Sequence, residues 1–154
     1  MPMLKKIIFF VILLPLISFV QLPFYGYCGD WVKIGGNEHL TLYYDPLSVN
    51  IDKENKNIKV WVRNELTDKG RISFLESKNS IEKQKYSDIK NVLYLLLFNY
   101  KELKYTIKSL SYNDKSDNVL VFAKDIKDNW RNIQPYTGED MLFKKLLKDN
   151  NIQM

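Results

Sequence analysis

The scarcity of alanine is the feature that most restricts the fold of this chain. Ala123 is the only alanine among 154 residues, whereas 14% of the residues are aromatic and valine and isoleucine are plentiful. Alanine is the strongest helix former, while β-branched and aromatic side chains are enriched in strands. The composition therefore argues against a helical bundle and predicts strands. The chain is long enough for one folded domain and too short for two ordinary ones.

The N-terminus is typical of an export signal. Two lysines precede an apolar run over residues 7–20, and small residues at Gly26 and Cys28 predict cleavage after residue 28. Two alternatives stay open. Residues 4–27 could serve as an uncleaved membrane anchor, or Cys28 could carry a lipid, although Tyr27 is larger than the residue that normally precedes such a cysteine. All three readings place the following domain outside the cytoplasm, in the periplasm, on the outer surface or in the medium.

The chain is thus expected to consist of a signal or anchor over residues 1–28 and one exported domain over residues 29–154. One histidine and one cysteine exclude a His/Cys zinc site and an intrachain disulfide. The net charge is +5, and losing Lys5 and Lys6 with the signal leaves +3. The other lysines are scattered, unlike the basic stripe of a nucleic-acid-binding protein, so no nucleic-acid partner is expected. Weak attraction to anionic lipid or polysaccharide stays open.

Alternating or apolar runs separated by turn residues predict an antiparallel sheet. Residues 31–34 and 40–44 flank a Gly-Gly-Asn turn and are expected to form a hairpin. Residues 91–98 are apolar throughout, which favours a central strand buried on both faces, although periodicity alone leaves a helix open. The other expected strands cover residues 47–51, 58–62, 104–112 and 119–123. The strand over residues 104–112 is expected to contain a bulge between Ile107 and Leu110.

Two helices are expected. Residues 64–88 are polar and irregular, with a short helix only around residues 80–86. Near the C-terminus, Thr137 and Asp140 have the spacing of a capping box. The apolar residues that follow repeat at helical spacing and predict one buried face: Met141, Leu142, Phe143, Leu146 and Leu147. The predicted fold class is α+β, an antiparallel β-sheet of about six strands with a C-terminal α-helix packed on one face.

Several short motifs, taken in order, resemble the surface-adhesin protein E family of small exported proteins from Gram-negative bacteria. They are Trp31-Val-Lys-Ile, Tyr43-Tyr-Asp with Ser48-Val, Val60-Trp-Val, the paired strands over residues 97–111, and Trp130 with Pro135 before a terminal helix. The resemblance covers about residues 29–148. It implies an antiparallel sheet with a C-terminal helix on one face, and a role in binding host extracellular proteins at the bacterial surface.

The chain departs from that family in one respect. Members commonly tie the terminal helix to the sheet by a disulfide, but Tyr100 stands where the strand cysteine is expected and the helix has no cysteine. Such a bridge contributes about 2–4 kcal/mol. Packing of Phe143, Leu146 and Leu147 is expected to hold the helix instead, at about 1.5–3 kcal/mol for each fully buried side chain. The fold therefore tolerates this departure more easily than the adhesin function does.

No motif in the sequence assembles a catalytic, metal or cofactor site, and the chain is expected not to be an enzyme. His39 has no nucleophile beside it and is expected to lie in a surface loop. Residues 114–118 only weakly resemble a calcium loop and are expected to form a hairpin turn. Paired carboxylates could support glycoside chemistry, but the candidates are typical turn residues: Glu38, Asp45, Glu65 and Asp68.

Aromatic side chains are the remaining candidates for recognition, because Tyr and Trp supply rigid contact area with a polar tip. Trp31, Trp61 and Trp130 coincide with family positions and are expected in the core between sheet and helix. A tyrosine patch on the sheet, of unknown membership, is the expected interaction surface. The sequence favours an exported non-enzymatic envelope protein that binds a host or matrix protein. The alternative is a periplasmic or membrane-anchored accessory protein, and exposed sheet edges would allow a homodimer.

Overall fold

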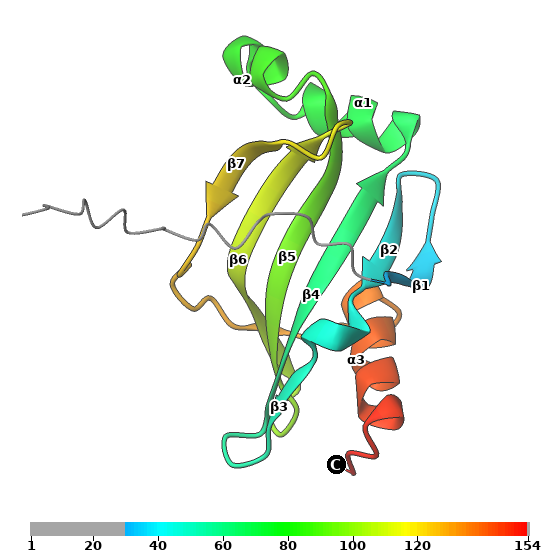
Figure 1. Cartoon of the computed structure of the whole chain (residues 1–154), viewed down its shortest axis with the longest axis vertical. Helices are drawn as coiled ribbons and strands as arrows, with labels where there is room; N and C mark the ends of the chain where they lie inside the picture. The colour runs from blue at the N-terminus through cyan, green and yellow to red at the C-terminus, as the bar shows by residue number, and fades with distance from the viewer. Residues whose placement is uncertain (1–29, 154) are drawn as a thin grey trace, which may run out of the picture.

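The computed structural model describes residues 30–153, so the predicted signal or anchor over residues 1–28 lies outside this range. The described residues form one antiparallel sheet (Figure 1) of eight strands: β1 (Val32–Gly36), β2 (Leu40–Tyr44), β3 (Asn50–Asp52), β4 (Asn57–Leu66), β5 (Ile89–Asn99), β6 (Lys104–Asp114), β7 (Val119–Ala123) and β8 (Arg131–Asn132). Their order is β1-β2-β4-β5-β6-β7, with β3 paired to β4 and β8 to β6. The antiparallel sheet is confirmed, and it has more strands than the six expected.

Three α-helices and a short 3-10 helix accompany the sheet in the described range. The helices α1 (Asp68–Glu76) and α2 (Ser80–Lys85) lie at one end of the sheet, and α3 (Gly138–Asp149) begins near β1 and β2 and runs toward the opposite end, where β3 lies (Figure 1). The 3-10 helix η1 (Pro46–Ser48) follows β2. The helix expected around residues 80–86 is confirmed as α2, whereas α1 was not expected. Within residues 30–153, no helix combines the length and apolarity needed to cross a bilayer.

The C-terminal helix α3 packs on one face of the sheet, as expected. Its N-cap is Thr137, whose hydroxyl accepts a hydrogen bond from the Asp140 amide at 3.2 Å. Met141 is 43% exposed and so does not belong to the buried face that the sequence predicted; its side chain lies beside Gly35 of β1. The other four predicted residues are buried against residues of the sheet. Together they form the main core, whose buried residues are Leu42, Tyr44, Ile58, Val60, Val62, Leu96, Phe98, Tyr100, Leu142, Phe143, Leu146 and Leu147.

The long strand β5 is the centre of the sheet, which settles the choice between strand and helix for residues 91–98. It pairs with β4 over nine residue pairs and with β6 along nearly its whole length. The predicted bulge is also confirmed. Leu95 pairs with Ser109 and Leu96 with Ile107, so Lys108 has no partner residue in the ladder. A bulge of this kind shifts the side-chain alternation by one residue.

Two turns differ from the sequence prediction. The first hairpin keeps both glycines inside β1 and turns later, where the Asn37 side chain accepts the amides of His39 and Leu40 at 2.8 and 3.0 Å. The expected strand over residues 47–51 is shorter, because Pro46–Ser48 forms η1. The Asp45 carboxylate caps that 3-10 helix by accepting the Leu47 amide at 2.9 Å.

A second apolar cluster lies where α1 and α2 meet the sheet. Its buried residues are Tyr86, Ile89 and Val92. The rings of Phe74, Tyr86 and Tyr112 pack edge-on or tilted, with centroids 5.4–5.7 Å apart. Tyr94 of β5 packs against both this cluster and the α3 core. The helices α1 and α2 therefore cover the same face of the sheet as α3, but at a different place.

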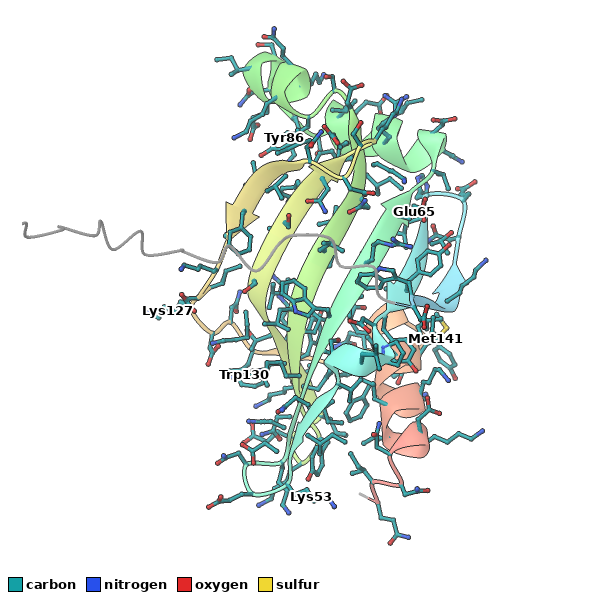
Figure 2. The ribbon with its side chains drawn as sticks, viewed as in Figure 1. Lys53, Glu65, Tyr86, Lys127, Trp130 and Met141 are labelled. Carbon is teal, nitrogen blue, oxygen red and sulfur yellow. The ribbon has the colours of Figure 1, made fainter. Side chains whose placement is uncertain are left out.

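The three tryptophans are not part of the core between the sheet and α3, contrary to expectation. Trp61 alternates with the buried Val60 and Val62, so its side chain lies on the opposite face. On that face the Arg63 guanidinium lies 4.8 Å from the Trp31 ring centroid. Trp130 is 39% exposed, between β7 and β8 (Figure 2). The expectation from the family pattern is therefore wrong for all three: Trp31 and Trp61 lie on the opposite face of the sheet, and Trp130 is partly exposed instead of buried in the core.

Candidate ligand-binding pocket

A pocket of about 460 Å³ lies on the α3 face of the sheet, beside the N-terminal end of the helix. The labelled Met141 marks this end of α3 in Figure 2. Ligand sites in proteins commonly have volumes of about 300–1,000 Å³. The floor is apolar and is formed by one residue from each of four strands and one residue of α3: Leu42, Val62, Leu96, Ile107 and Leu142. The walls and rim are more polar and include Asn37, Asn64, Tyr94, Tyr105, Arg131, Tyr136 and Glu139.

Local backbone chemistry places the wall that α3 contributes. Gly138 is the first residue of the helix, and a Cβ atom there would lie 2.9 Å from Leu42 Cδ2. A glycine therefore lets the helix begin close to β2. The preceding Tyr136 has a left-handed backbone (φ 66°), and its side chain is 95% exposed at the pocket rim. The turn before α3 thus carries an aromatic ring that is free to contact an incoming group.

Tyr94 is a half-buried polar residue of the pocket wall. The pKa of its phenol is raised to about 12, mainly by burial and in smaller part by the neighbouring Tyr112 and Glu139, while the Asn64 side chain opposes them. The phenol therefore stays protonated at neutral pH and can donate a hydrogen bond. The Asn64 Oδ1 atom is buried without a hydrogen-bond partner. An unpaired buried acceptor costs about 1–3 kcal/mol, which a donor reaching Asn64 would relieve.

Two opposite charges also line the pocket. Arg131 comes from β8 and Glu139 from the first turn of α3. Among residues 30–153, neither side chain forms an ion pair within 4.0 Å. The pocket thus offers an apolar floor, buried and exposed phenols, and two charges that a ligand could engage.

The residues that the sequence suggested for catalysis lie elsewhere and have local partners. His39 lies in the β1–β2 turn, with its Nε2 atom 3.3 Å from Glu38 Oε1. Glu65 lies 3.9 Å from Arg63 on the other face of the sheet, and Asp68 lies 3.8 Å from Arg71. Asp45, as described above, caps η1. These carboxylates are therefore not gathered around one reacting position.

Residues 114–118 form the expected hairpin turn. The Asp114 carboxylate accepts hydrogen bonds from the Asn118 side chain and from the amides of Ser116 and Asn118, and the Asn118 side chain is the main cause that lowers the Asp114 pKa. Across the described range, no three His, Cys, Asp or Glu side chains gather in a metal-binding arrangement.

Sequence reasoning did not single out the pocket residues. One signal was present: Tyr94 and Leu96 on β5, and Tyr105 and Ile107 on β6, alternate on the same face. That signal identifies a face, while the hollow depends on where α3 begins. The tyrosine patch stays a prediction, and three tyrosines line this pocket: Tyr94, Tyr105 and Tyr136.

Comparison with known proteins assigns no family. No protein-family model matches the chain, and no curated protein matches it.

Proposed function

We propose that this chain is an exported, non-enzymatic binding protein of the bacterial envelope, similar to surface adhesin E, that holds an apolar side chain of a protein partner in the pocket beside α3. The observation that carries the proposal is the pocket itself, with its apolar floor and with Arg131 and Glu139, which form no ion pair within residues 30–153. The apolar run after two lysines at the N-terminus supports export.

The chemistry of the pocket suits a protein side chain. Burying a leucine- or phenylalanine-sized group against the floor contributes about 1.5–3 kcal/mol. The phenols of Tyr94 and Tyr105 can accept or donate hydrogen bonds at the edge of that group. Arg131 and Glu139 would favour a partner segment that carries charges of both signs, and charge complementarity mainly determines specificity and association rate.

A pocket-filling variant tests this proposal. Ile107→Phe adds volume to the floor, and Ile126→Phe is the matched control, because Ile126 is also half-buried and does not line the pocket. Cells producing each variant are applied to immobilised extracellular-matrix proteins. We expect Ile107→Phe to lose most of the adhesion that the wild type shows, and Ile126→Phe to keep it. Equal adhesion of both variants would contradict the pocket as the binding site.

Protease treatment of intact cells tests the location. Released fragments, together with a mature N-terminus near Gly29 found by mass spectrometry, would support a surface adhesin. A protected chain that retains Lys5 and Lys6 would instead support the alternative, an anchored periplasmic accessory protein, and the adhesin proposal would fail.

A further inference from the structure

A second hollow lies at the opposite end of the molecule from α1 and α2, where two hairpin turns meet the segment after α3. The turn between β3 and β4 carries Lys53 and Lys56, and the turn after β5 carries Lys101. The Tyr100 amide donates a hydrogen bond to the Lys56 carbonyl at 2.9 Å, which joins the two turns. The space between them has a volume of about 430 Å³. Lys53 is labelled at this end in Figure 2.

The lining of this hollow has one sign of charge. Three lysines line it, together with amide side chains that include Asn151 and Gln153, and no carboxylate side chain of residues 30–153 does. Within the described residues, none of the three lysines forms an ion pair. The positive charge of three lysines is therefore gathered around one hollow.

Nearby acidic side chains have other partners or lie outside the lining. Asp52 accepts two hydrogen bonds from Asn55, at 2.9 and 2.7 Å. Glu102 pairs with Lys104 at 3.2 Å, and Asp149 pairs with Lys145 at 3.0 Å. Glu54 is exposed on the same turn as Lys53 and is not a lining residue. Among the described residues, no carboxylate side chain therefore lines the hollow or forms an ion pair with its three lysines, while Asp52 and Glu54 carry negative charge next to Lys53 in the chain.

We propose that this hollow binds a phosphate group, either free or as the head of a phospholipid. A phosphate monoester carries about −1.5 to −2 charges at pH 7 and three strong acceptor oxygens. Such a group matches three ammonium groups and neighbouring amide donors better than a carboxylate, which has one charge. This site is separate from the pocket beside α3, so the two proposals can fail independently.

Titration of the exported chain with inorganic phosphate tests the site, with acetate as the singly charged reference. We expect saturable phosphate binding that is at least several-fold tighter than acetate binding. Lys53→Gln should weaken it about three- to tenfold, as expected for loss of one unit charge near the anion. Lys101→Gln should act similarly. Lys127→Gln removes the same charge from the exposed segment between β7 and β8 (Figure 2) and should change the affinity less than twofold.

Vesicles distinguish the two sources of phosphate. Co-sedimentation is measured with phosphatidylcholine alone and with added phosphatidic acid, using variants that share one N-terminus so that any insertion of residues 4–27 is equal. Vesicle binding that requires phosphatidic acid and is weakened by Lys53→Gln but not by Lys127→Gln would identify the lipid headgroup. If Lys53→Gln weakens only the binding of inorganic phosphate, and the vesicles are not bound, the ligand is free phosphate. Three results would each overturn the proposal. They are equal effects of Lys53→Gln and Lys127→Gln, equal binding of acetate and phosphate, and no saturable binding of either phosphate source.

Discussion

Gly70 determines how closely α1 approaches the β1–β2 turn. It is buried in the first turn of that helix, and a Cβ atom there would overlap the His39 carbonyl oxygen. The same junction is held by Thr67, whose hydroxyl accepts the Gly70 amide at 3.0 Å and donates to the Glu38 carbonyl at 2.7 Å. The close contact therefore leaves no space for a larger residue.

We expect Gly70→Ala to lower the free energy of unfolding by about 1–3 kcal/mol, because the backbone must shift to admit the methyl group. Urea denaturation measures the loss. Ser73→Ala is the matched control, since Ser73 is exposed in the same helix and alanine is the better helix former there. A Gly70→Ala protein as stable as Ser73→Ala would show that the junction adjusts without cost.

Tyr94 should make stability depend on alkaline pH. Its pKa is about 12 in the folded protein and about 10 in the unfolded chain. Between these values the unfolded chain has released the proton and the folded protein has kept it, so stability falls as pH rises through this window. The shift corresponds to at most about 2–3 kcal/mol. Tyr44 and Tyr112, whose pKa values burial also raises, add to the same trend.

Tyr94→Phe should therefore make the free energy of unfolding fall less steeply between pH 10 and 12, while changing it little at pH 7. Thermal unfolding across this range gives the slope. Tyr136→Phe removes a phenol from a fully exposed ring and should keep the wild-type slope. If Tyr94→Phe also kept that slope, burial of Tyr94 would not govern its proton.

Among the larger elements, α3 depends on packing in place of a covalent tie. Leu146 is 1% exposed in the core with Phe98 and Phe143, and the two phenylalanine rings lie 5.5 Å apart. Leu146→Ala should cost about 2–5 kcal/mol, as for other buried leucines. Met141→Ala, at an exposed position of the same helix, should cost less than about half as much. Urea denaturation of both variants decides whether burial against the sheet holds the helix.

The elements that the sequence predicted correctly are those whose signals are local. The β5 run, the bulge near Lys108 and the α3 cap depend on residues adjacent in the chain. The helix α1 was missed because its apolar side chains, such as the exposed Ile72, do not form one continuous stripe. The pocket was missed because its floor and walls come from residues far apart in sequence, and their meeting depends on where α3 crosses the sheet.

At the scale of the whole molecule, the sheet ends in two outer strands, β1 and β7. The exposed Val119 lies on β7, and an unpaired strand edge can recruit a second strand. We predict that the chain forms a homodimer through β7 edges. Sedimentation equilibrium should show concentration-dependent association that Val119→Lys abolishes. Ile81→Lys, an equal change at an exposed position of α2, should leave association intact; a monomer at every concentration would exclude the dimer.

The arrangement of strands also bears on the order in which the protein folds. The sheet is built almost entirely from neighbours along the chain, whereas α3 joins β2 across a separation of 105 residues, as in the hydrogen bond from Tyr44 to Asp149. Closing a loop of that length is entropically costly and slow compared with forming hairpins. The sheet should therefore form first and α3 should dock last, which pulse-labelled hydrogen exchange would detect as late protection of the helix. A newly made chain would pass through a stage in which its strands are paired and the pocket beside α3 does not yet exist.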